Sequence, residues 1–374
     1  MQLDSVESAI SAIAAGELVV VVDDIDRENE GDLIMAAAMA SPEKIAFMIR
    51  HTSGIICVPM ATDRAEALNL APMVANNRDP FRTAFTVTVD YKVGMTTGIS
   101  AQERTNTIRA LAGGNAHASD FVRPGHIFPL MAREGGVLAR SGHTEAGVDL
   151  ARLAGLEPAG VLAEVVNDDG TVKRLPELLA FAREHGLRII SIEDLIAYRL
   201  RNESILARVG VVPTEVAGLS ARAFIYESAF DPMQQIALVI GEVEGGEHVP
   251  CRIHRDQPVG DLVAQAGGAV PWARRAAEEI ARRGRSGILI LVRSAGALEE
   301  ASQGRKTPKG SDEAPREGHD SAIERMRRWR EVGVGAQILR DLGVRSIDLL
   351  ATSEVQYVGL GGFGIEIADT ILIG

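Results

Sequence analysis

The chain has 374 residues, enough for two domains that each bury a core of their own. Its net charge of −12, from 51 acidic and 39 basic side chains, argues against a nucleic-acid-binding surface. No apolar stretch reaches the roughly 18 residues that span a bilayer, and the first residues lack the pattern of an export signal. Two cysteines, Cys57 and Cys251, form neither a disulfide framework nor a multi-cysteine zinc site. We therefore expect a cytoplasmic globular protein that binds neither nucleic acid nor membranes.

The first predicted elements are a helix and a buried strand. Residues 5–15 carry apolar side chains at helical spacing and stop at Gly16. Four consecutive valines, Val19 to Val22, predict a buried strand, because branched Cβ atoms pack well on a pleated surface.

An acidic loop over residues 23–32 follows this strand directly, at the kind of position where α/β proteins gather ligand sites. Like charges at this density repel one another, so a folded chain keeps them when something compensates the charge. A solvated loop is one interpretation of such an acidic run. A bound Mg²⁺ or Mn²⁺ is the other, since both ions prefer hard oxygen ligands. The carboxylates are those of Asp23, Asp24, Asp26, Glu28, Glu30 and Asp32.

The next predicted elements are mainly structural. Ser41 and Pro42 predict the start of a helix that ends near residue 51. Residues 55–59 predict a short strand, in which Cys57 is more typical of a packed core than of a nucleophile. Residues 85–89 alternate as Phe-Thr-Val-Thr-Val, which is typical of a half-buried strand. Glycine and hydroxyl groups precede a predicted helix over residues 102–112 and offer a seat for an anion.

Two later stretches combine arginine, glycine and histidine in front of an apolar element. His126 precedes one of these elements, and His143 opens a helix for which Thr144 is a candidate N-cap. In the functional interpretation, Arg140 and the helix N-terminus hold a phosphate, while His143 faces a metal or a proton in transfer. Glu164 ends an otherwise apolar run, so its carboxylate needs a partner or a role.

At this point the chain resembles a known enzyme family. Its segments DDIDRENEGDL, FTVTV with TTGISA, RPGHIFPL and GGVLARSGHTEAGVDLARLAGL are similar to those of 3,4-dihydroxy-2-butanone 4-phosphate synthase, an enzyme of riboflavin biosynthesis. The similarity covers about residues 5–200, with the motifs in family order and spacing. It implies an α+β domain, usually a homodimer, that converts ribulose 5-phosphate to dihydroxybutanone phosphate and formate with Mg²⁺ or Mn²⁺.

The resemblance also implies roles for individual residues. The implied metal ligands are Glu28 and His143. The substrate and its phosphate are contacted by Arg27, Glu28, Asp32, Arg140, Ser141, Gly142, His143, Thr144 and Glu164. The implied catalytic positions are His126, Glu164, Glu30 and Cys57. The division of acid and base roles among Glu30, His126, His143 and Glu164 stays open.

The second half of the chain predicts another α+β domain. Strand-like runs at 207–212, 221–226 and 235–240 follow a polar join, and helices are predicted near 270–283 and 323–342. We place the synthase domain at residues 1–202 and the second domain at residues 203–374. Residues 299–320 are rich in glycine, proline and charged side chains and are predicted to form a loop or an insertion.

This half resembles GTP cyclohydrolase II without its working residues. The framework is visible at Arg252-Ile253-His254, Gly260-Asp261, Gly335 to Val344 and Gly361 to Ile365. The three zinc cysteines of that family fall on Gln257, Gly268 and Val270, none of which ligates zinc as a thiolate does. Two further signatures are altered, at residues 293–298 and 351–354. Hydrolytic ring opening needs an activated water, so we expect no zinc and no cyclohydrolase activity.

Three interpretations follow. The leading one is a metal-dependent synthase fused to a catalytically silent domain with a structural or regulatory role. A bifunctional enzyme with a zinc-free cyclohydrolase site is the second, and turnover of GTP would support it. A non-catalytic scaffold is the third, but a scaffold has no need for a costly cluster of like charges in its acidic loop.

Overall fold

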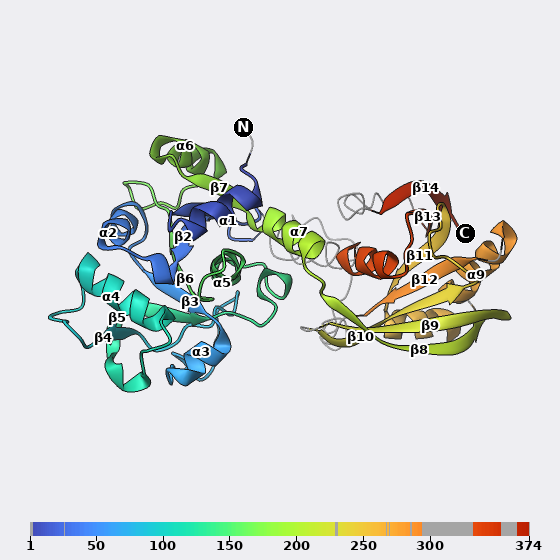
Figure 1. Ribbon diagram of the computed structural model, residues 1–374, viewed down its shortest axis with the longest axis horizontal. Coiled ribbons are helices and arrows are strands. Elements are labelled where there is room, and N and C mark those ends of the chain that lie inside the picture. The colour runs from blue at the N-terminus through green and yellow to red at the C-terminus, as the bar shows by residue number, and fades with distance from the viewer. Residues whose placement is uncertain are drawn as a thin grey trace, which may run out of the picture. The chain divides into compact units, whose positions relative to one another are not determined.

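The computed structural model describes residues 3–25, 27–228, 231–266, 268, 270–284, 286–293, 332–352 and 365–373. The chain divides into two compact units, the first ending at Tyr198 and the second beginning at Arg199 (Figure 1). Helix α7 (Ile192–Asn202) runs through this division, so we keep 202/203 as our proposed domain boundary. Among the described residues, no helix is both long enough and apolar enough to cross a membrane.

The first unit is built on a seven-stranded mixed sheet in the order β4-β5-β3-β6-β2-β1-β7 (Figure 1). Its strands are β1 (Val19–Val22), β2 (Gly31–Ala36), β3 (Cys57–Met60), β4 (Val89–Tyr91), β5 (Phe121–Met131), β6 (Gly160–Glu164) and β7 (Arg188–Ser191). Its helices before α7 are α1 (Val6–Ala14), α2 (Pro42–His51), α3 (Thr62–Ala67), α4 (Ala101–Ala112), α5 (His143–Leu153) and α6 (Leu175–His185).

Both faces of this sheet are covered, which is why β1 and β2 are buried along their whole length and carry only one charged side chain, Asp32. All four valines of β1 and all six residues of β2 are buried. Val20 and Leu33 belong to a core shared with apolar side chains of α2, α4 and α6. Because side chains alternate along a strand, Val21 and Asp32 face the other side, where α5 packs on β2. A carboxylate on β2 therefore points toward α5.

Two predicted details differ from the structure. Residues 85–89 do not form one strand: Phe85 and Thr86 make isolated bridges to neighbouring segments, and β4 begins at Val89. Helix α5 is capped by Gly142, not by Thr144, so the Thr144 side chain lies in the first turn and does not serve as the cap. The prediction of one strand was wrong because alternating apolar and hydroxyl side chains also suit a segment that forms single bridges to two partners, Pro72 and Leu130.

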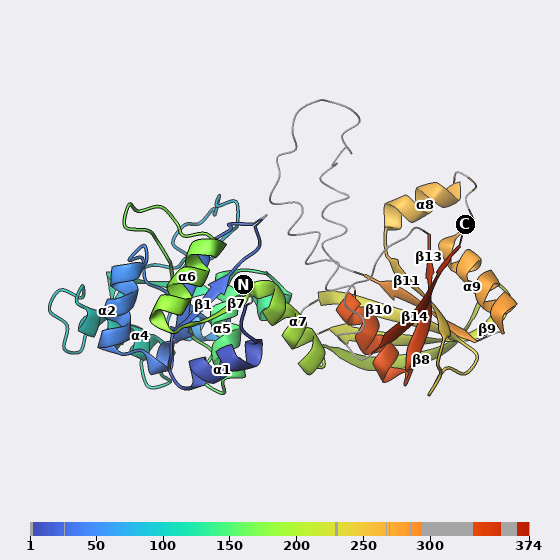
Figure 2. The same ribbon diagram turned by 90° about the horizontal axis from the view of Figure 1, so that it is seen from above.

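The second unit contains another seven-stranded sheet, in the order β14-β13-β11-β12-β10-β9-β8 (Figure 2). The strands are β8 (Leu206–Val216), β9 (Leu219–Ser228), β10 (Asp231–Ile240), β11 (Val249–Arg255), β12 (Gly287–Val292), β13 (Ser346–Ala351) and β14 (Glu366–Leu372). The described helices are α8 (Pro258–Ala266), α9 (Trp272–Arg283) and one over residues 332–341. Leu289, Ile280 and their neighbours form a separate apolar core. The predicted loop at 299–320 lies outside the described residues.

Candidate active site

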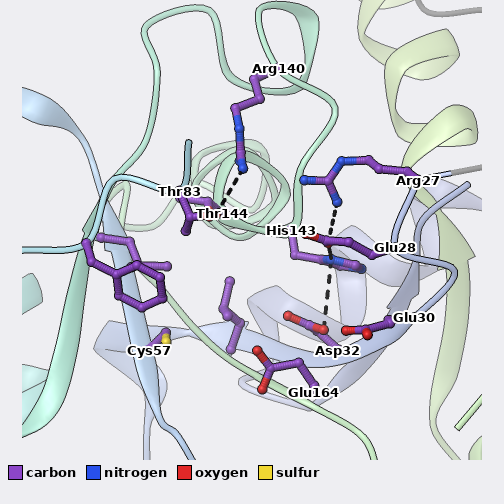
Figure 3. A pocket seen from close by; sticks show the side chains of 13 residues that line it. Arg27, Glu28, Glu30, Asp32, Cys57, Thr83, Arg140, His143, Thr144 and Glu164 are labelled. Carbon is purple, nitrogen blue, oxygen red and sulfur yellow. Dashed lines mark hydrogen bonds and ion pairs between the residues drawn. The ribbon is translucent and has the colours of Figure 1, made fainter. Parts of the chain in front are cut away.

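The cavity of interest lies on the α5 face of the first sheet. It is lined by side chains from the acidic loop, from β2, β3 and β6, and from the segment that leads into α5 (Figure 3). Acidic groups and an imidazole gather on one side, and Arg140 enters from the other with Thr83 and Thr144 (Figure 3). The lining residues are Arg27, Glu28, Glu30, Asp32, Cys57, Thr83, Phe85, Leu130, Arg140, His143, Thr144, Leu162 and Glu164.

His143 is the buried imidazole of this cavity. Its Nε2 lies 3.1 Å from the carbonyl oxygen of Val21 on β1. A carbonyl only accepts hydrogen bonds, so Nε2 carries the proton of the neutral ring and Nδ1 keeps its lone pair. Nδ1 faces Glu28 at 3.7 Å and Asp32 at 3.9 Å. The imidazole thus directs Nδ1 toward two carboxylates.

The acidic loop is organised by Asp23 and Arg27. The Asp23 carboxylate accepts hydrogen bonds from the backbone N–H groups of Glu28 and Glu30. It also forms an ion pair with Arg27 at 2.9 Å. Arg27 also pairs with Glu28. These contacts fold the loop back on itself and hold the Glu28 side chain beside His143. The ligand atoms of Asp23, Glu28 and His143 lie within 4.8 Å of one another, the one such cluster among the residues that the structure describes.

The pKa values of the three central groups reflect this crowding. Burial raises the pKa of Glu28, but its pairing with His143 and Arg27 outweighs burial and lowers the pKa to about 2. Burial lowers the pKa of His143, but Asp32 and Glu28 raise it to about 9. Burial, with Glu164, Glu28 and Glu30 nearby, raises the pKa of Asp32 to about 8. Without a further cation, His143 and Asp32 therefore keep their protons to a higher pH than an ordinary histidine or aspartate does.

Asp32 and Glu164 are brought together by strand pairing. Asp32 on β2 lies opposite Glu164 at the end of β6, so both side chains project from the same face. The Asp32 side chain is 4% exposed, and its Oδ1 has no hydrogen-bond partner. Glu164 accepts a hydrogen bond of 2.6 Å from the Ser53 hydroxyl. A buried carboxylate oxygen without a hydrogen bond is costly, which marks Asp32 as a group that awaits a ligand.

Arg140 forms the cationic side of the cavity. Its guanidinium pairs with the buried carboxylate of Glu145 at 2.7 Å and donates to the carbonyl of Phe81 and the hydroxyl of Thr83. A Cβ atom at Gly142 would lie 2.3 Å from Arg140 Nη1, so only glycine allows this approach. The free backbone N–H groups of the first turn of α5 begin beside this arginine. Together they form an anion seat.

Most of the predicted site residues meet in this cavity. Nine of them line it: Arg27, Glu28, Glu30, Asp32, Cys57, Arg140, His143, Thr144 and Glu164. Ser141 and Gly142 do not, and Gly142 instead caps α5. Thr83, Phe85, Leu130 and Leu162 line the cavity without having been predicted as site residues. Their hydroxyl and apolar side chains carry no signal of a site in the sequence.

Cys57 lines the cavity from β3 as a buried, protonated thiol. Burial, together with the charges of Glu164 and Asp32, raises the pKa of Cys57 well above its usual value. Nucleophilic cysteines depend on a lowered pKa. The electrostatics therefore suit Cys57 as an apolar wall of the cavity rather than as an attacking group.

His126 lies on β5 and does not line the cavity. Its Nδ1 is 2.6 Å from Asp90 Oδ2, and the imidazole is 41% exposed. Within a single chain it therefore belongs to a second, outward-facing group. The sequence motif RPGHIFPL indicated the importance of His126 but not this position.

In the second unit, the three positions at which the resemblance to GTP cyclohydrolase II places zinc cysteines lie on the surface. Gln257, Gly268 and Val270 are all exposed. His254 at the end of β11 pairs with Asp261 at 3.0 Å and stacks on Trp272, with 4.1 Å between ring centroids. The altered signatures fall mostly outside the described residues, which include Arg293 but not 294–298, and Thr352 but not 353–354.

Comparison with known proteins agrees with this two-part organisation. The family described as 3,4-dihydroxy-2-butanone 4-phosphate synthase matches residues 7–198, and the family described as GTP cyclohydrolase II matches residues 207–372. Riboflavin biosynthesis protein RibBA of Salinispora arenicola is 44% identical, over 98% of this chain and 88% of that protein. Two Arabidopsis thaliana proteins are also 44% identical over 98% of this chain: monofunctional RIBA 2 (76% of its length) and bifunctional RIBA 1 (68%).

Solved structures show the same likeness. RibBX from A. baumannii, described as a two-domain 3,4-dihydroxy-2-butanone 4-phosphate synthase, is 38% identical, with a TM-score of 0.77 over 98% of this chain and 99% of that one. A synthase in complex with two magnesium ions is 47% identical, with a TM-score of 0.52 over 54% of this chain and 98% of that one. Fold, site and relatives define an enzyme of riboflavin biosynthesis with two domains. The chain belongs to the 3,4-dihydroxy-2-butanone 4-phosphate synthase family and carries a GTP cyclohydrolase II domain behind its synthase domain.

Proposed function

We propose that the first unit converts D-ribulose 5-phosphate to 3,4-dihydroxy-2-butanone 4-phosphate and formate. The observation that carries this proposal is one cavity with an anion seat at Arg140 and a cluster of carboxylates around His143. The distance between these two sides lets a phosphate bind away from the carbons that react. Binding energy from the phosphate then orients those carbons.

A divalent cation fits the acidic side of the cavity. Glu28 and His143 are the proposed ligands, because Glu28 is ionised and His143 presents Nδ1 with its Nε2 proton held by Val21. The unsatisfied Oδ1 of Asp32 faces the same space. Mg²⁺ or Mn²⁺ suits these ligands better than zinc does, and a related synthase is described with two magnesium ions. Such an ion would stabilise the oxyanions that form during enolisation and skeletal rearrangement.

The remaining groups of the cavity suit substrate binding and proton transfer. Arg140, Thr83 and the first turn of α5 with Thr144 hold the phosphate. Arg27, braced by Asp23, and Asp32 contact the sugar hydroxyls. Glu30 has a pKa raised by burial and by the charges of Glu28 and Glu164, so it takes up a proton more readily than an ordinary glutamate. Glu164, on the same acidic side of the cavity, is the second proton carrier (Figure 3).

The test is an assay of metal-stripped full-length protein resupplied with Mg²⁺ or Mn²⁺. Ribulose 5-phosphate is offered, and the release of formate and of dihydroxybutanone phosphate is measured. We expect both products in equal amounts and only with the divalent ion. Formate release that is unaffected by removal of all divalent metal would contradict the metal site.

We further propose that the second unit has no cyclohydrolase activity. The support is the replacement of the zinc cysteines by Gln257, Gly268 and Val270. In addition, relatives that match 98% of this chain include one described as a two-domain synthase and one described as monofunctional. The alternative is a bifunctional enzyme, as one plant relative is described. Purified protein is given GTP with zinc, magnesium or manganese. A pyrimidine product that follows the protein through every purification step, and that also forms with the synthase variant Glu28→Gln, would favour the bifunctional alternative.

A homodimer is the proposed assembly, and it offers His126 a route to a reaction site. His126 faces outward from β5 in its own chain, so a second copy is the molecule whose cavity it can approach. Glu28→Gln and His126→Ala variants, each inactive alone, are refolded together. Recovery of activity in the mixture supports a site built from two chains. No recovery, with dimers confirmed by light scattering, contradicts it.

A further inference from the structure

Asp90 and His126 form a hydrogen-bonded pair, and neither residue lines the cavity. Asp90 lies on β4 with its side chain 4% exposed, while His126 on β5 is 41% exposed. One carboxylate oxygen, Oδ1, accepts the backbone N–H of His126 at 2.9 Å. The other, Oδ2, lies 2.6 Å from Nδ1 of the imidazole. A buried carboxylate that uses both oxygens on one histidine fixes the position of the whole residue.

The backbone approaches this pair closely at two glycines. A Cβ atom at Gly98 would lie 2.1 Å from Asp90 Oδ2 and 2.9 Å from His126 Nδ1. A Cβ atom at Gly125 would lie 2.0 Å from the backbone of Val89. Gly98 also has φ of +83°, which glycine adopts without strain. Two glycines therefore let two backbone segments close on the carboxylate and its histidine.

The segment that carries Gly98 is itself anchored. Glu103 accepts hydrogen bonds from the Thr96 hydroxyl at 2.8 Å and from the Ser100 hydroxyl at 2.8 Å, across the loop that contains Gly98. Arg104, the next residue of α4, donates to the carbonyl of Ile99 at 2.9 Å. Both ends of the loop are tied to α4, so Gly98 keeps its place over Asp90.

We propose that Asp90 is a positioning residue for the synthase reaction: it holds the proton of neutral His126 on Nδ1 and leaves the exposed Nε2 to accept and return a proton. An ionised carboxylate only accepts hydrogen bonds, so it selects the Nδ1–H tautomer and stabilises the imidazolium that forms after proton uptake. This inference rests on the proposed catalytic role of His126. The step balances because the proton that Nε2 takes up is later released from Nε2, while the Nδ1 proton stays between His126 and Asp90.

The decisive substitution is Asp90→Asn. The amide oxygen keeps the hydrogen bond from the His126 backbone, which places the NH₂ group opposite Nδ1. Nδ1 must then accept a hydrogen bond, and the imidazole switches to the Nε2–H tautomer. Long-range ¹H–¹⁵N spectra of histidine-labelled full-length protein distinguish the two tautomers, with the signal of His126 identified by its loss in His126→Ala. We expect Nδ1–H in the natural protein and Nε2–H in Asp90→Asn. The same tautomer in both proteins would overturn the proposal.

Kinetics supply the second readout. General acid–base catalysis contributes about 10²–10⁴-fold, so Asp90→Asn should lower kcat by about 10²-fold or more with little change in KM. His126→Ala should lower kcat at least as far, and the double variant no further, because the two side chains act as a unit. Losses that multiply in the double variant would show a merely structural Asp90. Full activity of His126→Ala would reject the proposed role of His126 itself, and with it this inference, whatever the tautomer.

Two matched controls separate the dyad from general strain. Asp149 is another buried aspartate that accepts a backbone N–H, from Val137 at 2.8 Å, beneath a glycine of positive φ, Gly136. Asp149→Asn should leave kcat near that of the natural protein. Gly98→Ala should mimic Asp90→Asn, whereas Gly94→Ala, at φ of +73° with no atom within 4 Å of its Cβ, should not. Equal losses in the two glycine variants would point to backbone strain and contradict the proposal.

Discussion

The ends of β1 and β11 differ in how far the protein satisfies its own buried polar groups. After β1, the buried Oδ1 of Asp32 has no hydrogen bond, and His143 points Nδ1 at two carboxylates. Near the end of β11, Nε2 of His254 pairs with the Asp261 carboxylate, and the imidazole ring stacks on Trp272. The first arrangement is costly unless a ligand completes it. In the second, Asp261 and Trp272 supply the partners of His254 within the protein.

The strongest test of the first site is Glu28→Gln, which keeps the shape of a proposed ligand and removes its charge. Residues that only support a metal ligand typically contribute 10–100-fold to activity, so loss of the ligand should lower formate release by at least about 10²-fold. Glu17→Gln, an exposed glutamate just before β1, is the control. Unchanged turnover in Glu28→Gln would remove Glu28 from the metal site.

The pH dependence of metal binding is the next largest effect. The metal-free pKa of His143 is raised to about 9, so a proton must leave before Nδ1 can bind an ion. We expect the apparent affinity for Mn²⁺ to rise about tenfold per pH unit between pH 6 and 8 for that one proton. Isothermal titration calorimetry in buffers of different ionisation enthalpy measures the proton release directly. Binding that is independent of pH in this range would contradict a protonated His143.

The same pKa values predict how the metal-free protein responds to pH. The pKa values of His143 and Asp32 are both raised in the folded state. Their contribution to the free energy of unfolding is fully present below their unfolded pKa values, which are near 6.5 and 3.8, and is lost as pH rises toward 9 and 8. Added Mg²⁺ should therefore raise the Tm of the first unit more at pH 9 than at pH 6. Scanning calorimetry with and without EDTA checks this.

Two leucines allow the stabilities of the two units to be compared. Leu33 on β2 and Leu289 on β12 are both fully buried, each in the core of its own unit. Leu→Ala at either position should lower the free energy of unfolding of its unit by about 2–5 kcal/mol. We expect each substitution to move one calorimetric transition and to leave the other in place. A single transition that moves with both would show that the units unfold together.

The smallest expected effect is on the second unit. Asp261→Asn removes the charge that faces His254 and should lower the stability of this unit by about 1 kcal/mol. The kcat and KM for ribulose 5-phosphate should not change, because the substitution lies outside the synthase cavity. Altered synthase kinetics in this variant would indicate that the second unit regulates the first.

Much of the site could be predicted from the sequence because its chemistry is local. The acidic loop, Arg140, His143 and Thr144 sit in short motifs, and the first turn of α5 brings the last two together by helix geometry alone. The buried strand Val19–Val22 and the helix after Ser41 followed from residue type and capping in the same way. The prediction that Gln257, Gly268 and Val270 replace zinc cysteines likewise needed no fold, because it rests on residue type alone.

The tertiary structure alone decided which distant residues became neighbours. Asp32 and Glu164 meet through the pairing of β2 with β6, and Cys57 reaches the cavity through β3. Thr83 lies beside Arg140 in the cavity, and His126 lies outside the cavity beside Asp90. Neither position could be predicted, because the sequences of these segments do not show which segments they pair with. A sequence pattern indicates the chemistry of each side chain and the face of the helix or strand on which it lies. Which strands lie side by side depends on the packing of both faces of the sheet, and that is a property of the whole unit.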